Sequence, residues 1–111
     1  MSKVPSDPAD DYVYCITRLD LPQPHLSIQV GHALIAATKA YLPTISTHPN
    51  LIIVTVPDEP ALEKAFNRLK EKGTPVAAWY EPDLGNTLTA IATGLLRGEQ
   101  RQPLRHYPLL R

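Results

Sequence analysis

Segments rich in β-branched and apolar residues alternate along this chain with segments of helical length, and this alternation limits the folds that it can adopt. Helix-length crossovers favour parallel strand pairs, whereas a short connection allows a strand to reverse. The predicted order is β-α-β-α-β-β, which indicates an α/β fold: one mixed four-stranded sheet with helices packed on it. Strands are predicted at 12–17, 51–56, 76–80 and 88–93, and helices at 26–42 and from about 58 to 73.

The length and composition of the chain fit one compact domain. It has 111 residues, of which 43% are apolar and 20% charged, so it can bury a single hydrophobic core. Residues 1–11 contain two prolines and three aspartates without periodicity, and they are predicted to be a flexible N-terminal tail. The domain is predicted to span residues 12–111, and one functional site is expected.

Composition also disfavours several classes of protein. No apolar run approaches the roughly 20 residues that cross a bilayer, and the N-terminal segment lacks the apolar centre of a secretory signal, so we expect a cytoplasmic protein without a membrane partner. The single cysteine, Cys15, lies in a predicted strand, which favours a buried thiol over a reactive one. His25 and His32 lie two helical turns apart, about 10 Å along the axis, so a metal site is not expected.

The overall charge argues against a large nucleic-acid footprint, because eleven Lys and Arg balance eleven Asp and Glu. The charges are nevertheless unevenly distributed along the chain. The N-terminal segment is acidic, and the C-terminal segment is basic, so a local basic patch stays open. Its arginines are Arg97, Arg101, Arg105 and Arg111.

A polar stripe runs along the first predicted helix, which is otherwise apolar. It consists of His25, Gln29, His32, Ala36 and Lys39, which fall within an arc about 80° wide on a helix. A solvent-exposed face explains such a stripe as well as a cleft does, and the spacing does not separate the two. Gly31 in the same helix costs about 1 kcal/mol relative to alanine, and close approach of another backbone or a ligand is the usual compensation.

The loop between the last two predicted strands contains Asp83, Gly85, Asn86 and Thr87. Turn chemistry alone accounts for these residue types, because Asp and Asn favour turns and Gly supplies a positive φ. The alternative is that the loop holds a carboxylate and a hydroxyl in position to orient water. No Gly-x-Ser-x-Gly motif occurs, which disfavours covalent catalysis by a serine hydrolase mechanism.

Four motifs together resemble the peptidyl-tRNA hydrolase 2 family. Each motif is weak by itself, but they occur in the family's order on the same predicted β-α-β-α-β-β pattern, across about residues 12 to 93. The Trp-Tyr-Glu-Pro segment at 79–82 looks like the corresponding segment of a divergent single-domain branch of that family. The motifs are Arg18-Leu19-Asp20-Leu21, Gln29-Val30-Gly31-His32-Ala33, Pro57-Asp58-Glu59 and Asp83-Leu84-Gly85-Asn86-Thr87.

The resemblance implies a function, a partner and a set of site residues. Proteins of this family hydrolyse the ester between a peptide and the terminal ribose of tRNA, need no metal or other cofactor, and are often dimers, so tRNA is the expected partner and a homodimer stays open. By the same mapping, Asp83 would activate the attacking water and Thr87 would help to place it. The substrate contacts would be Gln29, His32, Arg18, Asp20 and Asn86.

One position departs from the family pattern. The family carries a lysine just before the helical motif, and His25 stands at the matching position after a slightly shorter loop. We include His25 with Asp83 and Thr87 among the catalytic candidates, although histidine is mostly neutral at pH 7 and lysine is charged. Two rival functions follow: a non-catalytic module that binds RNA or protein on the same fold, and hydrolysis of another aminoacyl or peptidyl ester.

Overall fold

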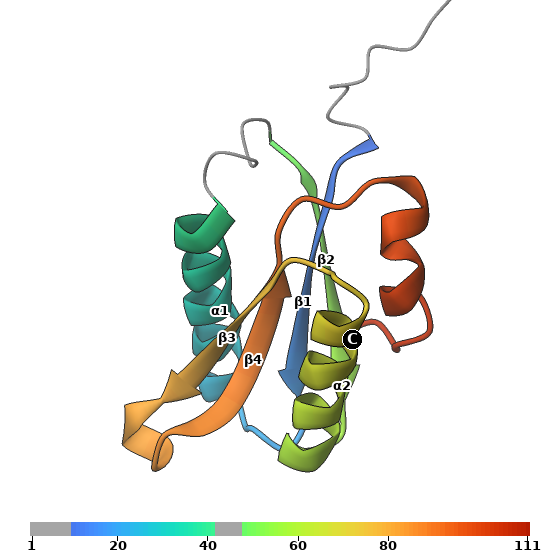
Figure 1. Ribbon diagram of the computed structural model, residues 1–111. Helices are drawn as coiled ribbons and strands as arrows, with labels where there is room; N and C mark the ends of the chain where they lie inside the picture. The colour runs from blue at the N-terminus through green and yellow to red at the C-terminus, as the bar shows by residue number, and fades with distance from the viewer. Residues whose placement is uncertain (1–9, 42–47) are drawn as a thin grey trace, which may run out of the picture.

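The computed structural model describes residues 10–41 and 48–111, which form a four-stranded sheet, two α-helices and two 3₁₀-helices, arranged as Figure 1 shows. The predicted N-terminal tail lies outside the described residues, except for Asp10 and Asp11. The strands are β1 (Tyr12–Arg18), β2 (Asn50–Val56), β3 (Val76–Glu81) and β4 (Thr87–Thr93). The α-helices are α1 (His25–Tyr41) and α2 (Glu59–Glu71), and the 3₁₀-helices are Pro82–Leu84 and Gly98–Leu104.

The sheet has the order β2-β1-β4-β3 and mixed strand directions. β1 pairs with β2 in parallel, and β4 runs antiparallel to both β1 and β3. The helical crossover through α1 yields the parallel pair, and the short β3–β4 connection yields the reversal, as the sequence predicts. The predicted mixed α/β sheet is therefore confirmed.

One helix covers each face of the sheet. Side chains of β1 alternate between the two faces: Cys15 packs with Val30 and Ala33 of α1, while Ile16 packs with Leu62 of α2. Figure 1 shows α1 on one side of the sheet, with α2 and the C-terminal 3₁₀-helix on the other. Cys15 is fully buried as predicted, and burial raises the pKa of its thiol to about 12.

Local sequence signals explain where α2 begins and ends. Asp58 is the N-cap, and its carboxylate accepts a hydrogen bond from the Ala61 backbone N–H at 3.1 Å. Pro60 lies in the first turn, where its missing N–H costs nothing. Gly73 follows the helix with φ of 77°, a conformation that favours glycine.

The C-terminal segment packs against the α2 side of the molecule and the open edge of β2. Leu96 and Leu104 are fully buried in the core on that side. Further along, the Thr55 N–H donates to the Pro108 carbonyl at 2.8 Å, and the Leu110 N–H donates to the Ile53 carbonyl at 2.9 Å. This segment therefore covers an edge that would otherwise expose unpaired backbone groups.

Two arginines of the basic C-terminal segment make contacts within the fold. Arg97 pairs with Asp11, which is fully buried although the sequence places it in the tail. Arg101 lies over the Tyr12 ring at 3.4 Å and donates to the Tyr14 hydroxyl at 3.1 Å. The packed domain thus includes Asp11, and these two guanidinium groups hold the C-terminal segment against β1.

None of the helices in the described part of the chain combines the length and the apolar character needed to cross a lipid bilayer.

Candidate active site

Gln29, from the polar stripe of α1, is buried with a hydrogen bond at each end of its amide. Only 3% of the residue is exposed. Its Nε2 donates to Glu81 Oε1 at 3.0 Å, and its Oε1 accepts from Thr89 Oγ1 at 3.0 Å. An unpaired buried amide would cost about 1–3 kcal/mol, so these two bonds allow Gln29 to face the sheet. Gln29 therefore connects α1 to the β3–β4 hairpin.

Glu81, the last residue of β3, gathers hydrogen bonds from three directions. Its Oε1 accepts from Gln29 and, at 3.5 Å, from Trp79 Nε1, while its Oε2 accepts from the Asp83 backbone N–H at 3.2 Å. The pKa of Glu81 is lowered most by the hydrogen bond from Gln29 and next by the bond from the Asp83 backbone N–H, while burial acts in the opposite direction. The ionised carboxylate thus holds the start of the hairpin loop.

A bulge in the β3–β4 pair places Thr89 toward α1. Trp79 pairs with Ala90 and Tyr80 pairs with Leu88, so Thr89 is the extra residue on β4. Its side chain is fully buried and donates to Gln29. The bulge therefore supplies the second partner that the Gln29 amide requires.

The loop that contains Asp83 is a tight turn. A short 3₁₀-helix, Pro82–Leu84, is followed by Gly85 and Asn86 with φ of 70° and 61°. Glycine and asparagine adopt this left-handed region most readily, so turn geometry alone explains why these two residue types occur here. Asp83 and Asn86 are exposed, and Thr87 is half-buried at the start of β4. The described residues leave the Asp83 carboxylate open to solvent.

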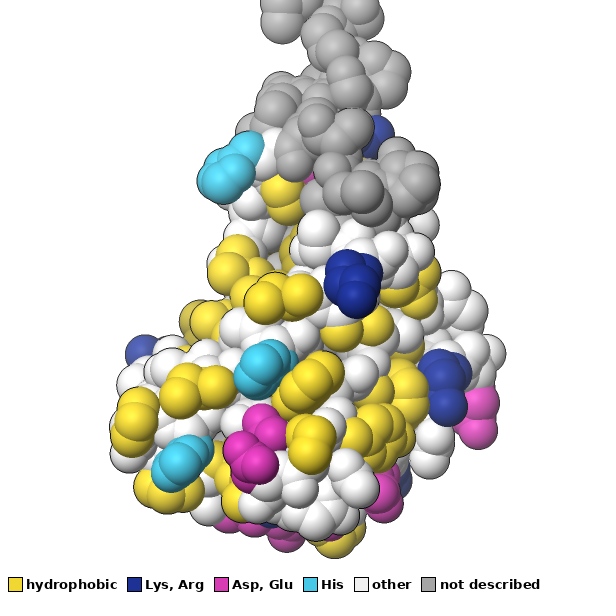
Figure 2. Space-filling view, turned by 90° about the vertical axis from the view of Figure 1, so that its left-hand side faces the viewer, with side chains coloured by type: hydrophobic (Ala, Val, Ile, Leu, Met, Phe, Trp, Pro, Cys, Tyr) yellow, Lys and Arg dark blue, Asp and Glu magenta, His cyan; other side chains and the backbone are white. Residues whose placement is uncertain are grey.

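His32 stacks on Trp79 beside this network. Their ring centroids lie 4.4 Å apart, and the rings are inclined by 13°. Together with Ile35, Ala36 and Lys39 they border a surface cavity of about 500 Å³. Figure 2 looks onto the face that α1 covers and shows histidine and acidic side chains close together in its lower half. The stacked rings of His32 and Trp79 give the α1 face a flat aromatic surface next to the charged side chain of Lys39.

Arg18 and Asp20 lie on the other side of the sheet. Arg18 donates to both carboxylate oxygens of Asp20, at 2.8 and 2.9 Å, and to the Leu88 carbonyl at 3.0 Å. The bond from Arg18 lowers the pKa of Asp20. Arg18 follows Ile16 by two residues on β1, so both side chains lie on the α2 face of the sheet. The bond from Arg18 to the Leu88 carbonyl links the end of β1 to the start of β4 on that face.

The structure therefore divides the predicted site residues into groups. His25, the exposed first residue of α1, lies one turn from Gln29 on the same stripe. Glu81 ties that stripe to the backbone of the loop with Asp83. Of the predicted site residues, only His32 lines the cavity beside Trp79, and Asp83 is not among its lining residues. Arg18 and Asp20 lie across the sheet from this cavity.

Sequence reasoning missed Glu81, Trp79 and Thr89. The predicted strand 76–80 ends one residue before Glu81, whereas β3 includes it. Glu81 follows Trp79 by two residues and so faces the same side of the extended strand. A carboxylate on the covered face of a strand requires partners, and that was the available signal. Thr89 could not be found from pattern, because the bulge shifts the alternation of β4. Within the described residues, no three or more His, Cys, Asp or Glu side chains are grouped to hold a metal ion.

Comparisons with known proteins bear on the fold. No protein-family model matches the chain, and no curated protein sequence matches it. The solved structure of a protein of unknown function from Agrobacterium tumefaciens is similar, with a TM-score of 0.71 at 12% sequence identity. The match covers 92% of this chain and 98% of that one. At this identity the likeness shows a common fold and carries no statement about activity.

Proposed function

We propose that this chain is a peptidyl-tRNA hydrolase that cleaves the ester between a peptide and the terminal ribose of tRNA. The resemblance of the four motifs supports the proposal, and one observation carries it. Gln29 and the Asp83 backbone both bond to Glu81, so motifs from α1 and from the β3–β4 loop belong to one hydrogen-bonded unit. Such a unit can hold an exposed carboxylate at a fixed place beside the stripe of α1.

The proposed chemistry assigns Asp83 the role of general base. Its carboxylate takes a proton from water, and the resulting nucleophile attacks the ester carbonyl carbon. The bond to the ribose oxygen then breaks, and that oxygen receives the proton. General base catalysis contributes about 10²- to 10⁴-fold, which suits an ester because the bond is already activated. Thr87, at the start of β4, would help to place the water.

The proposed tRNA contacts lie on the α1 face. The stacked rings of His32 and Trp79 offer a surface for an unpaired base at the end of the tRNA, and base stacking of this kind is worth about 1–3 kcal/mol. Lys39 and His25, at the two ends of the polar stripe, are exposed for contact with phosphates. The proposed binding surface therefore extends along α1 toward the loop.

A binding module without catalysis is the second candidate, and the buried state of Gln29 favours it. Both ends of the Gln29 amide are committed within the protein, so this side chain has no free group for a substrate. The family's lysine is also absent from the position of His25. A protein that kept the fold and the aromatic surface could bind RNA or a protein partner without hydrolysing an ester.

A release assay separates these functions. N-blocked aminoacyl-tRNA and the same tRNA with a free amino group are incubated with the protein, and the freed acyl group is measured. Selective release from the blocked form supports peptidyl-tRNA hydrolysis. Release from both forms assigns a general aminoacyl esterase, and binding without release assigns the non-catalytic module.

A further inference from the structure

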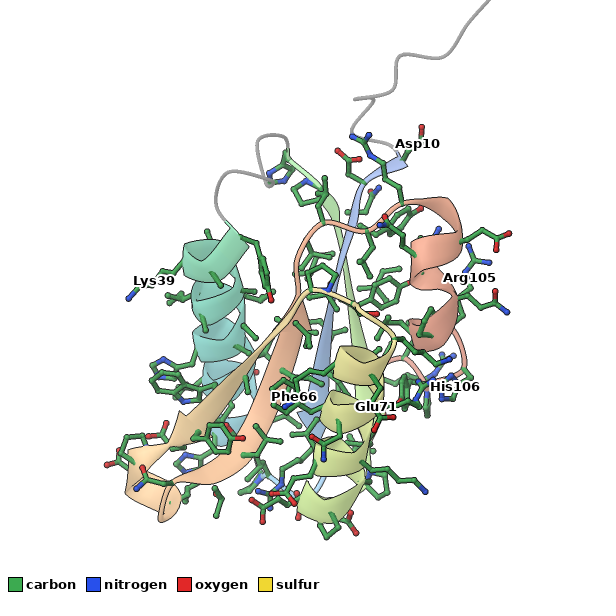
Figure 3. All side chains as sticks on the ribbon, in the orientation of Figure 1. Asp10, Lys39, Phe66, Glu71, Arg105 and His106 are labelled. Atoms are coloured by element: carbon green, nitrogen blue, oxygen red, sulfur yellow. The ribbon has the colours of Figure 1, made fainter. Side chains whose placement is uncertain are left out.

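A larger cavity, of about 590 Å³, lies on the α2 side of the sheet. It is bordered by α2, by the end of β2 with the residues that follow it, and by the C-terminal segment. Figure 3 shows His106 beside α2, on the side of the molecule opposite to Lys39 of α1. Leu19 and Pro57, from two of the four motifs, line this cavity, whereas the polar stripe and the Asp83 loop do not. The cavity is therefore separate from the residues to which the proposed hydrolysis assigns the chemistry.

The walls of this cavity are set by small side chains and by backbone bonds. Ala61 and Ala65 occupy neighbouring turns of α2 and leave space above the sheet. Across from them, Arg68 Nη2 donates to the Pro103 carbonyl at 2.6 Å and to the Tyr107 hydroxyl at 2.9 Å. The Thr55–Pro108 backbone bond fixes the same segment to β2. The cavity is therefore formed before any ligand enters.

The lining is apolar in its body and cationic at its edge. Leu19, Val56, Ala61, Ala65 and Tyr107 provide most of the apolar surface. Its basic lining residues are Lys64, Arg68 and His106, and none of the described residues that line it is an aspartate or a glutamate. Lys64 is exposed, and the described residues provide it with no ion-pair partner. This combination complements a molecule that has an apolar body and a negative end.

We propose that this cavity binds a small amphipathic anion, an organic carboxylate with an aryl or alkyl body. The body would lie against Val56, Ala61 and Ala65, and the carboxylate would meet Lys64 and the free donors of Arg68. The volume lies within the range of about 300–1,000 Å³ that is typical of small-molecule sites. The proposal does not depend on ester hydrolysis at Asp83.

The test compares three probes by isothermal titration calorimetry on the whole chain: 2-naphthylacetate, its uncharged amide and acetate. We expect saturable binding of one 2-naphthylacetate per chain, binding of the amide weaker by about tenfold because it lacks the charge-assisted bonds, and no detectable binding of acetate. Equal affinity for the amide and the carboxylate would overturn the assignment of an anion site.

Variants locate the site. Lys64→Gln should weaken naphthylacetate binding about threefold, because an exposed ion pair contributes little, and Ala61→Phe should abolish it by filling the cavity. Lys39→Gln on α1 removes the same charge elsewhere and should leave the affinity unchanged. Circular dichroism and thermal unfolding establish that each variant is folded, and Lys64→Gln tests the site even if Ala61→Phe does not fold.

Two further results would overturn the proposal. The first is an unchanged affinity in both Lys64→Gln and Ala61→Phe, which would place the ligand elsewhere. The second is a combination of three findings. The parent chain binds no naphthylacetate, light scattering shows it to be a dimer, and Ala61→Phe converts it to a monomer. That result would make the cavity a contact between two copies of the chain.

Discussion

Glu81 is the residue on which the candidate site depends. Its carboxylate joins the Gln29 amide of α1 to the backbone of the loop that carries Asp83. These bonds favour the ionised form, so the pKa of Glu81 lies below its ordinary value in the folded protein. Folding and the placement of Asp83 are thereby linked to one titratable group.

This linkage predicts how Glu81→Gln changes stability with pH. A lowered folded-state pKa means that the charged form of Glu81 contributes stability above about pH 4.3, the ordinary glutamate value, and that this contribution is lost as pH falls through the folded pKa. We expect the variant to be less stable than the parent at pH 7, with a smaller difference at acidic pH. Urea unfolding at both pH values measures this.

The matched control for that measurement is Glu63→Gln, an exposed position on α2. Its effect should stay within about 0.5 kcal/mol at either pH. A destabilisation by Glu81→Gln that had the same size at pH 7 and at acidic pH would show that the charge of Glu81 is not what holds the loop.

At the scale of elements, α1 contains a glycine, Gly31, that no backbone from another described element approaches closely. Apart from its chain neighbours and the nearby backbone of α1, no heavy atom of the described residues lies within 4 Å of the position that a Cβ would take on Gly31, so an added methyl group has room. Gly31→Ala should therefore stabilise the fold by about 1 kcal/mol in chemical denaturation. Gly73→Ala is the control of opposite sign, because φ of 77° strains any side chain there. Destabilisation by Gly31→Ala would contradict the open environment described here.

The C-terminal segment offers a second element-scale prediction, based on two arginines in different environments. Arg101→Ala removes the stacking on Tyr12 and the bond to Tyr14, and it should cost about 1–2 kcal/mol of unfolding free energy. The exposed Arg105→Ala should cost less than about 0.5 kcal/mol. Equal costs for the two variants, measured by urea unfolding, would contradict a structural role for Arg101.

At the scale of the whole molecule, the order of elements and the mixed sheet followed from the sequence, because periodicity and β-branched runs mark the buried faces of β1, β2 and α2. The docking of the C-terminal segment did not. It joins β2 through backbone groups such as the Pro108 carbonyl, and backbone bonds leave no side-chain pattern. Two arginines of the basic C-terminal segment are likewise engaged in tertiary contacts, since Arg97 and Arg101 contact partners distant in the chain.

The candidate site was predictable only in part for a similar reason. The stripe on α1 and the loop at Asp83 were visible as local patterns, whereas the residue that joins them was not. Glu81 and Thr89 lie 52 and 60 residues from Gln29, their common partner, in the sequence, and Thr89 reaches it through the bulge in β4. Polar pairing of this kind depends on how α1 packs on the sheet. That packing brings together residues distant in the chain, so it leaves no local pattern in the sequence.

The most direct test of the central claim is single-turnover release of the acyl group from N-blocked aminoacyl-tRNA by the parent and by Asp83→Asn. The account predicts that the parent accelerates release and that Asp83→Asn slows it by about 10²- to 10⁴-fold, with unfolding free energy changed by less than about 0.5 kcal/mol. Glu71→Gln, an exposed acid on α2, should release at the parent rate. Equal rates for the parent and Asp83→Asn, or no acceleration by the parent, would contradict the account.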